Sequence, residues 1–328
     1  LRTILKSFAD KRILVIGDLM LDRFLWGEVS RISPEAPVPV VQVESEELYP
    51  GGAANVARNL LPFAASVGVV GQIGDDPEGD QLLALLEEAG LDSRGVQRTG
   101  GNPTTVKTRV VARNQQVVRI DREQYAEPTA EQSHRTAAGI AERLPEIDAI
   151  VLQDYGKGFL TQDFVDRLAE LAGDSGPVVT VDPNPNNAIN WRGATAIKPN
   201  RHEAFRFAGL PEAALADLPS EDPLLREVAG QLFERWGTRH LLITLGEQGM
   251  VLCDRGAQSF THIPPRAHEV FDVSGAGDTA IALFTLALAA GAPPVEAAEI
   301  SNWASAVVVG KVGTATLTPE ELVEACTR

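Results

Sequence analysis

A glycine turn followed by a long uncharged segment constrains the fold more than any other feature of this sequence. Residues 270–288 read V-F-D-V-S-G-A-G-D-T-A-I-A-L-F-T-L-A-L, and residues 279–291 contain no charged side chain. An uncharged segment of this length predicts a helix that is buried on all sides. Gly275, Ala276 and Gly277 at its start allow backbone amides to approach a ligand closely, and a helix N-terminus favours an anion such as phosphate.

Asp278 directly follows this turn and has three interpretations. A carboxylate repels the anion that the amides attract, unless it takes a proton from the group that attacks a phosphate. Asp278 is alternatively a helix cap that the helix dipole favours. The residues G-A-G-D-T-A also fit the loose dinucleotide fingerprint G-x-G-x-x-G/A, but the helix runs into G-A-P-P at residues 291–294, outside the βαβ context of that fingerprint. On the turn alone, the cap and the catalytic base are equally supported.

Composition limits the classes of protein that fit. At 328 residues and 44% hydrophobic content, the chain suits one large α/β domain or two smaller ones. A net charge of −16 disfavours nucleic acid and anionic membranes, so a phosphate site has to be local. Cys253 and Cys326 lie far apart, which predicts neither a disulfide framework nor a thiolate zinc site. Residues 1–12 lack the apolar region of a signal peptide, and a cytoplasmic protein is expected.

Alternating strand and helix patterns predict a doubly wound α/β fold with a parallel sheet. Strands are expected at residues 12–17, 66–74, 147–152, 178–181 and 240–244, and helices at residues 77–90, 130–143 and 161–172. Asp22 and Asp154 follow such strands, and the carboxyl ends of parallel strands meet at the edge where ligands bind. Asp22 would accept hydrogen bonds from a sugar diol; a solvated turn carboxylate is the simpler interpretation.

Two further segments predict a small accessory sheet, or lid. Prolines and alternating valines fill residues 24–43, and residues 104–112 and 115–121 alternate like a hairpin that turns at 113–114. The hairpin carries Lys107 and Arg109, which are either solvated edge charges or contacts to an anionic substrate. Apolar residues on the outer face of the lid require a partner, and a homodimer through the lids is expected. These apolar residues are Val38, Val40, Val41 and Val43.

Three short motifs have both a structural and a functional interpretation. Gly51-Gly52 with Asn55 allows close approach of a ligand and an amide contact to a hydroxyl, or is a plain flexible turn. Asn200 and Glu203 are spaced i, i+3, which suits phosphate oxygens and a magnesium-bound water, or a helix capping box. The residues Thr244, Gly246 and Gly249 lie in T-L-G-E-Q-G, which admits a nucleotide or forms a hairpin.

Taken in order, these motifs resemble the ribokinase-like (PfkB) sugar kinase family. The diglycine with Asn, the N-x-x-E, the T-x-G-x-x-G and the D-x-S-G-A-G-D match its order and spacing over nearly the whole chain. The resemblance implies an α/β, three-layer αβα fold with a mostly parallel central sheet. It also implies a single kinase domain over residues 1–328 with small β-lid segments at about 24–44 and 104–121, which uses ATP and Mg²⁺. No Walker A motif competes with this interpretation.

The resemblance also implies roles for individual residues. Asp278 would be the base and 275–277 the amides that hold the transferring phosphate, with the Asp278 pKa kept low by the helix terminus. The sugar would contact Asp22, Gly51, Gly52, Asn55 and Asp154. ATP, with its magnesium held through phosphates and a Glu203-bound water, would contact Asn200, Glu203, Thr244, Gly246, Gly249 and Asn302. A monovalent-cation loop for K⁺ would include Asp272, Ser274 and Gly313, although Lys311 would replace the ion with its own charge.

Within the family, segments such as S-R-I-S-P-E-A-P-V-P-V and D-Y-G-K-G look most like members that act on heptose 7-phosphate in ADP-heptose synthesis, at the anomeric hydroxyl. A sugar phosphate requires local cations, and the candidates are Arg31, Lys107, Arg109, Arg119 and Lys157. No H-x-G-H follows residue 320, which resembles a kinase domain without a fused nucleotidyltransferase. The alternatives are a kinase for ribose, fructose or fructose 6-phosphate, a sugar-binding protein without catalysis, and an NAD-dependent oxidoreductase.

Overall fold

A computed structural model describes residues 2–113, 115–173, 175–214, 216–267, 273–311, 313 and 315–327. Within these residues a nine-stranded sheet has the order β13-β12-β11-β10-β9-β8-β1-β4-β5. Pairing is parallel from β5 to β11, and β12 and β13 continue the sheet antiparallel. The strands are β1 Arg12–Gly17, β4 Ser66–Gly74, β5 Asp92–Thr99, β8 Ala149–Gln153, β9 Val178–Asp182, β10 Ala196–Ile197, β11 His240–Thr244, β12 Met250–Asp254 and β13 Ser259–Ile263.

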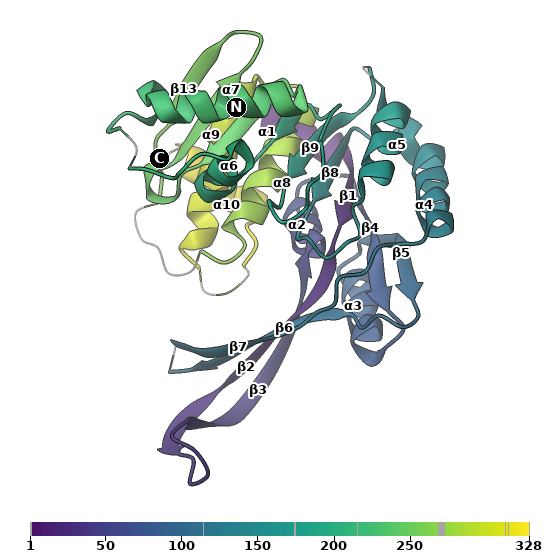
Figure 1. The fold of residues 1–328 in the computed structure, drawn as a ribbon, viewed down its shortest axis with the longest axis vertical. Helices are drawn as coiled ribbons and strands as arrows, with labels where there is room; N and C mark the ends of the chain where they lie inside the picture. The colour runs from purple at the N-terminus through teal and green to yellow at the C-terminus, as the bar shows by residue number, and fades with distance from the viewer. Residues whose placement is uncertain are drawn as a thin grey trace.

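Helices cover both faces of this sheet (Figure 1). Successive residues of β1 point to opposite faces, so Ile13 and Val15 belong to one apolar core and Leu14 and Ile16 to the other. The helices of the first core include α2 Ala53–Leu60, α3 Pro77–Glu88, α8 Ala276–Ala289, α9 Pro294–Val309 and α10 Pro319–Thr327, and those of the second are α4 Ala130–Arg143, α5 Gln162–Ala172, α6 Arg201–Ala208 and α7 Pro223–Trp236. The predicted three-layer αβα fold with a mostly parallel sheet is confirmed.

Helix α8 explains the uncharged segment of the sequence. Residues 278–287 of α8 are all buried, because the helix packs against α2, α9, β8 and β9. In the middle of the helix, the Thr285 hydroxyl contacts the Thr180 hydroxyl of β9 at 2.6 Å. A charge on any side of α8 would therefore be buried in the core, where it costs several kcal/mol. Within the described part of the chain, no helix is long and apolar enough to cross a bilayer.

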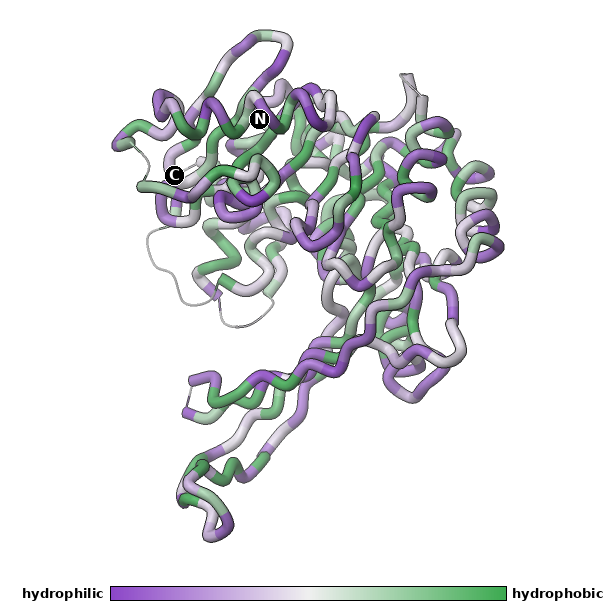
Figure 2. The backbone as a smooth tube through the Cα atoms, viewed as in Figure 1, coloured by the Kyte–Doolittle hydropathy of each residue, from purple (hydrophilic) through white to green (hydrophobic). Residues whose placement is uncertain are grey.

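A second sheet, the lid sheet, extends from the body as a twisted ribbon (Figures 1 and 2). Its order is β3-β2-β6-β7, with β2 Leu19–Ile32, β3 Pro39–Gly52, β6 Thr105–Ala112 and β7 Gln115–Arg122. The first hairpin is longer than the predicted 24–44 segment, because the chain leaves β1 at Gly17 and enters β2 two residues later. Gly51 and Gly52 end β3, and Gly52 has a φ of 61° before α2 begins. Of the predicted 113–114 turn, Asn114 lies outside the described residues.

Strand β5 has no counterpart among the expected strands. Its residues, D-S-R-G-V-Q-R-T, include a single large apolar side chain, Val96. An edge strand packs one partner only, so it needs little apolar surface and leaves a weak sequence pattern. At the other edge of the sheet, β11 and β12 form an antiparallel hairpin around the T-L-G-E-Q-G segment, so the hairpin interpretation of that segment is confirmed.

Candidate active site

Two adjoining cavities lie at the carboxyl edge of the parallel strands. The first measures about 580 Å³ and is lined by strand-end residues, among them Gln153, Asp182 and Lys198. The second measures about 520 Å³ and lies between the loop after β11 and helices α8 and α9. Thr244, Gly246, Val273 and Gly277 line both. Together they are large enough for an extended ligand with a polar end in the first cavity and an apolar end in the second.

Asp278, in the first turn of α8, lies at the centre of the first cavity. Its Oδ2 accepts a hydrogen bond of 2.7 Å from the Asn55 amide, and its Oδ1 accepts one of 2.7 Å from the Tyr155 hydroxyl. The Gln153 amide lies 3.4 Å from the same Oδ1. Two segments that are far apart in the chain, one with Asn55 and one with Gln153 and Tyr155, therefore hold the carboxylate in a single orientation, as a catalytic base requires.

Burial raises the pKa of Asp278 to about 6, while the bonds from Asn55 and Tyr155 lower it and nearby Asp182 raises it. The prediction of a low pKa was wrong, because desolvation of the carboxylate outweighs the hydrogen bonds and the helix terminus. A base with a pKa of about 6 remains mainly ionised at pH 7 and accepts a proton more readily than an exposed aspartate. The shift therefore favours the catalytic interpretation over the simple helix cap.

The amide end of α8 opens into the same cavity. Gly275 has a φ of 80°, which a side chain rarely adopts, and it precedes the first helical residue, Ala276. Lys198 lies opposite, because a Cβ added at Gly277 would be 3.7 Å from its Nζ. Lys198 was not among the predicted site residues; its one sequence signal is its place at the end of β10, directly before P-N-x-x-E.

Lys198 is buried and forms an ion pair of 3.0 Å with Asp182. Burial alone lowers the pKa of its ammonium, but Asp182 and Glu203 raise it overall, so the lysine stays charged. An anion in this cavity would thus meet the backbone amides of 275–277 on one side and a permanent cation on the other. Such a pair of groups stabilises the charge of a phosphoryl group during transfer.

Asn200 and Glu203 form a complete capping box at the start of α6. The Asn200 Oδ1 accepts from the Glu203 amide at 2.9 Å, and the Glu203 Oε2 accepts from the Asn200 amide at 2.8 Å. The structural alternative is therefore realised, but both side chains also line the first cavity. Burial and Asp182 raise the pKa of Glu203. Two neighbouring carboxylates suit a hydrated divalent cation, although nowhere in the described ranges do three metal-binding side chains gather to hold a metal directly.

The second cavity contains the remaining residues predicted to bind a nucleotide. Thr244, Gly246, Gly249 and Asn302 all line it. The Asn302 amide donates to the Pro264 carbonyl at 2.6 Å, so it holds one wall in place. Gly249 has no room for a side chain, because a Cβ would lie 2.2 Å from the Ile263 carbonyl oxygen.

The lid sheet places three of the residues predicted on the sugar side, Asp22, Lys107 and Arg109, on one face. The β2–β6 register pairs Asp22 with Lys107 and Phe24 with Arg109, so all four side chains share that face. Arg109 donates from Nη1 to Asp22 Oδ1 at 2.5 Å. A Cβ at Gly51 would clash with the same Asp22 carboxylate, which explains the first glycine of the pair.

Arg58 on α2 was missed in the sequence, where it looks like an ordinary helical surface residue. Its guanidinium lies 5.3 Å from the centre of the Tyr49 ring, and its Nη1 is buried without a hydrogen-bond partner. Burial lowers the pKa of Arg58, while Tyr49 and Asp22 raise it. Arg58 therefore adds a partly desolvated cation near the predicted sugar side of the site.

Asp154 lies at the wall of the first cavity, but its carboxylate is largely used by its own loop. It accepts a 2.8 Å bond from the Gly156 amide and longer contacts of 3.4 Å from Asn184 and Asn187. Burial and the neighbouring Asp18 raise its pKa to about 7. The carboxylate of Asp18 in turn accepts three backbone amides of the loop, those of Tyr155, Lys157 and Phe159.

The predicted monovalent-cation loop is only partly described. Asp272 lies outside the described residues, whereas Ser274 and Gly313 lie within them. The Lys311 ammonium donates to the Thr316 carbonyl at 2.9 Å and lies 2.7 Å from the Glu321 carboxylate. A permanent cation is therefore present in the segment where the family resemblance expects an ion.

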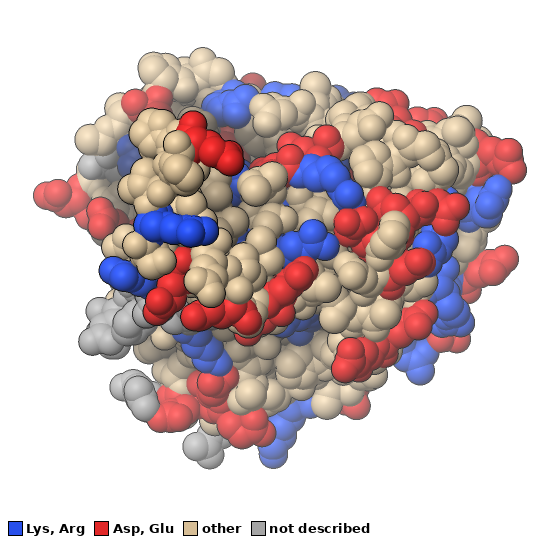
Figure 3. Space-filling model, turned by 90° about the horizontal axis from the view of Figure 1, so that it is seen from below, with Lys and Arg blue, Asp and Glu red and all other residues tan. Residues whose placement is uncertain are grey.

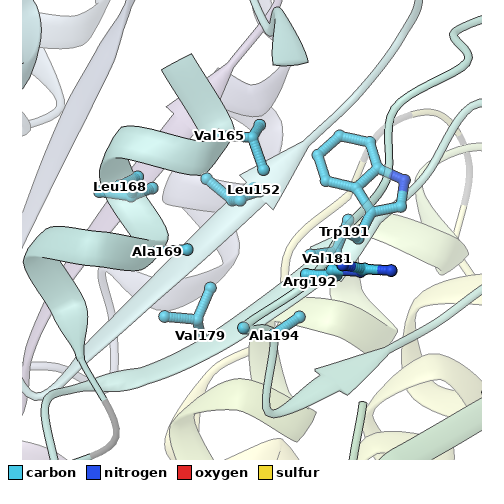
Figure 4. A pocket seen from close by; sticks show the side chains of 10 residues that line it. Leu152, Val165, Leu168, Ala169, Val179, Val181, Trp191, Arg192 and Ala194 are labelled. Atoms are coloured by element: carbon cyan, nitrogen blue, oxygen red, sulfur yellow. The ribbon is translucent and has the colours of Figure 1, made fainter. Parts of the chain in front are cut away.

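Two other features do not support a ligand site. A small cavity beside Trp191 measures about 10 Å³ and is lined mainly by apolar side chains such as Leu152 and Val165 (Figure 4); it is a packing gap barely large enough for one water molecule. Acidic and basic side chains are interspersed over the face seen from below (Figure 3). That face therefore has no single-signed basic surface for a polyanion.

Comparison with solved structures identifies the fold class. A ribokinase from Arabidopsis thaliana, solved with ribose and ATP, aligns at a TM-score of 0.74 with 18% identity, over 98% of this chain and 99% of its own. Phosphofructokinase-2 from Escherichia coli, solved with potassium, aligns at 0.74 with 18% identity, over 97% and 98%. The fold is therefore ribokinase-like.

Sequence comparison then identifies the family. Residues 10–321 match the pfkB family carbohydrate kinase description, and the chain belongs to that family. It is 42% identical over 315 residues to the bifunctional protein HldE of Desulfatibacillum aliphaticivorans, which covers 96% of this chain and 63% of the relative. It is 43% identical over 312 residues to that of Pelobacter propionicus, covering 95% and 62%. The chain thus spans a little under two thirds of the length of these curated relatives.

The predicted enzyme class is confirmed by these findings. The protein is an ATP-dependent sugar kinase, a family that uses ATP with a divalent metal. The oxidoreductase alternative and the non-catalytic alternative are therefore set aside.

Proposed function

We propose that this kinase transfers the γ-phosphate of ATP to the anomeric hydroxyl of a heptose 7-phosphate, in the synthesis of ADP-heptose for the lipopolysaccharide core. The observation that carries the proposal is the group of cations on the sugar side of the site. Lys107 and Arg109 share one face of the lid sheet with Asp22, and Lys157, in the loop after β8, pairs with Glu123 directly after β7. A neutral sugar needs no such group, whereas a sugar phosphate does.

Relatives support the choice of sugar. Curated proteins that are 42–43% identical over nearly the whole chain carry the name HldE, and the segments S-R-I-S-P-E-A-P-V-P-V and D-Y-G-K-G resemble kinases of heptose 7-phosphate. The shared name covers a bifunctional protein, of which this chain matches the part with the kinase site. A kinase for ribose, fructose or fructose 6-phosphate remains the alternative.

In the proposed reaction the sugar lies between Asp278 and the lid sheet. Asp278 takes the proton of the anomeric hydroxyl, whose oxygen attacks the γ-phosphorus of ATP in line with the leaving ADP. The amides of 275–277 and the ammonium of Lys198 stabilise the transferring phosphoryl oxygens. Tyr155 and Asn55 hold the base in position.

The residues also fit ATP with its metal ion. Asn200 would contact the phosphates, Glu203 would hold a metal-bound water, and Gly246, Gly249 and Asn302 would line the ribose and base. Mg²⁺, when bound, neutralises charge that accumulates between the phosphates. The carboxylates of Glu203 and Asp182, which interact at the cavity wall, are the observation that favours a hydrated cation here.

The experiment that tests this function compares ATP turnover on four acceptors. We expect kcat/KM for heptose 7-phosphate to exceed that for fructose 6-phosphate, ribose and fructose by at least about 100-fold, because charge-assisted phosphate contacts contribute a few kcal/mol in a sheltered cleft. A preference for an unphosphorylated sugar would refute the substrate and leave the sugar kinase class unchanged.

A further inference from the structure

Two lysine side chains from separate segments converge on one carboxylate oxygen. Lys157, in the loop after β8, places its Nζ 2.8 Å from the Oε2 of Glu123, and Lys107, on β6, places its Nζ 3.7 Å from the same oxygen. The lysine side chains are only 21% and 15% exposed. Two sheltered ammonium groups around one anionic oxygen are the arrangement that a phosphate monoester also accepts.

This lysine pair lies between the lid sheet and the loop that supports the base. Lys107 shares its face with Asp22. The backbone amides of Lys157 and Tyr155 donate to the same oxygen of Asp18, at 3.0 and 2.9 Å. The Tyr155 hydroxyl donates to Asp278. Lys157 therefore lies only two residues along the chain from a residue that contacts the base.

The other predicted cations are already neutralised or remote. Arg109 is bonded to Asp22, and Arg119 lies 3.0 Å from Asp121. Arg31 is exposed near the far end of β2. Lys107 also lies 3.6 Å from Asp121, which it shares with Arg119. Lys107 and Lys157 are the two candidates that meet at Glu123, beyond the end of β7.

Glu123 is more exposed than Asp22 and Asp121, the carboxylates that pair with Arg109 and Arg119, and it can therefore leave its partners more easily. It follows the end of β7, and residues 123–129 form neither helix nor strand. Its side chain is 34% exposed, so a rotation carries the carboxylate into water at little cost. Asp22, in contrast, is buried within β2.

We propose that Lys107 and Lys157 form the subsite for the phosphate of the sugar phosphate, and that Glu123 is an internal counter-ion which this phosphate displaces. The inference rests on the proposed function in taking the acceptor to be a sugar phosphate. A dianion attracts the two ammonium groups more strongly than one carboxylate does. A neutral sugar cannot displace Glu123, which gives the site a means of rejecting it.

Binding of inorganic phosphate tests the subsite without any sugar. The protein is saturated with Mg²⁺ and a non-hydrolysable ATP analogue, so that the nucleotide phosphate positions are filled, and phosphate is titrated by calorimetry. We expect Lys107→Met and Lys157→Met each to weaken binding by about tenfold, and Glu123→Gln to tighten it by about threefold or more. Lys11→Met is the matched control, because Lys11 pairs with Asp148 at 3.3 Å at the amino end of β1.

Steady-state kinetics provides the second measurement. The lysine variants should raise KM for heptose 7-phosphate by about tenfold with KM for ATP unchanged, and Glu123→Gln should lower the sugar phosphate KM. Weaker phosphate binding by Glu123→Gln, or unchanged binding by both lysine variants, overturns the subsite. If phosphate binds as expected but heptose 7-phosphate is not phosphorylated, the proposed substrate fails while the subsite stands.

Discussion

At the scale of the residue, the proposed role of Asp278 is to allow phosphoryl transfer in a site that would otherwise only bind its ligands. Asp278→Asn keeps the shape of the side chain but cannot accept the proton, so kcat should fall by at least about 100-fold while the affinity for ATP changes less than about threefold. Turnover and ATP binding are measured on the same preparation. Near-normal turnover of the variant would remove Asp278 from the role of base.

The thermal stability of the Asp278→Asn variant can also be predicted. The folded-state pKa of Asp278 is raised above its ordinary value of 3.8 to about 6, so ionisation of this carboxylate opposes folding as the pH rises through this window. Removing the charge should therefore leave the melting temperature at pH 8 no lower than that of the wild type. A lower melting temperature would indicate that the lost activity reflects misfolding.

Tyr155 should control the pH dependence of turnover. With an Asp278 pKa of about 6, kcat should be half-maximal near pH 6 and fall at lower pH as the base is protonated. Tyr155→Phe removes a donor to the charged form, so the half-maximal pH should rise by about one unit. Tyr125→Phe is the control, because its hydroxyl binds Glu127 at 2.7 Å on an exposed segment. An unchanged pH profile in Tyr155→Phe would show that Tyr155 does not influence the pKa of Asp278.

At the scale of the element, the capping box of α6 combines structural and functional roles that one pair of substitutions separates. Aspartate caps a helix as well as asparagine, so Asn200→Asp should change the melting temperature by less than about 2 °C. The new carboxylate would repel the phosphates, and KM for ATP should rise by about tenfold. Glu203→Gln likewise keeps the capping bond and should raise the Mg²⁺ concentration needed for half-maximal activity. Unchanged ATP and Mg²⁺ dependence would mean that the motif only caps the helix.

The segment between α9 and α10 leads to a prediction about monovalent ions. Lys311 already supplies a cation to the Thr316 carbonyl and the Glu321 carboxylate. Replacing K⁺ by tetramethylammonium should therefore change the turnover of the wild type less than about twofold. Lys311→Met leaves the carboxylate without its partner, and K⁺ should then partly restore its activity. Strong activation of the wild type by K⁺ would contradict this role for Lys311.

At the scale of the whole molecule, the lid sheet exposes apolar side chains at both of its hairpins. Val118 and Ile120 are 46% and 56% exposed and, by their register with β6, lie on the face opposite Asp22. Val38 and Val43 at the other hairpin are also about half exposed. Apolar surface of this kind on an extended ribbon favours association with a second copy of the chain.

We expect a homodimer through the lid sheets. The double variant Val118→Lys, Ile120→Lys should shift the protein from dimer to monomer in sedimentation at micromolar concentration, with less than about 3 °C change in melting temperature. Leu171→Lys is the control, since Leu171 is 39% exposed on α5, away from the lid. A monomeric wild type, or a double variant that still dimerises, would exclude this interface.

The sequence alone determined the architecture and the family. Strands β1, β4 and β11 and helix α4 begin and end at the predicted residues, because their apolar runs and their glycine, proline or capping boundaries are local signals. The uncharged helix α8 and its glycine turn could also be predicted from the sequence, because burial on every side excludes charged residues. Motif order then led to the family, and the residues predicted to bind a nucleotide line two adjoining cavities.

Only the tertiary structure decided how Asp278 is held and which cations lie near the proposed active site. Tyr155 and Asn55 lie 123 and 223 positions from Asp278 in sequence, so no local pattern could pair them with it. The raised pKa of Asp278 likewise depends on burial by several elements at once, which outweighs the helix terminus that the sequence shows. The same holds for Lys198, and for Glu123 between Lys107 and Lys157, because these charged groups come from distant parts of the chain. Their interaction energies depend on distances and on the exclusion of solvent, which spacing along the chain does not specify.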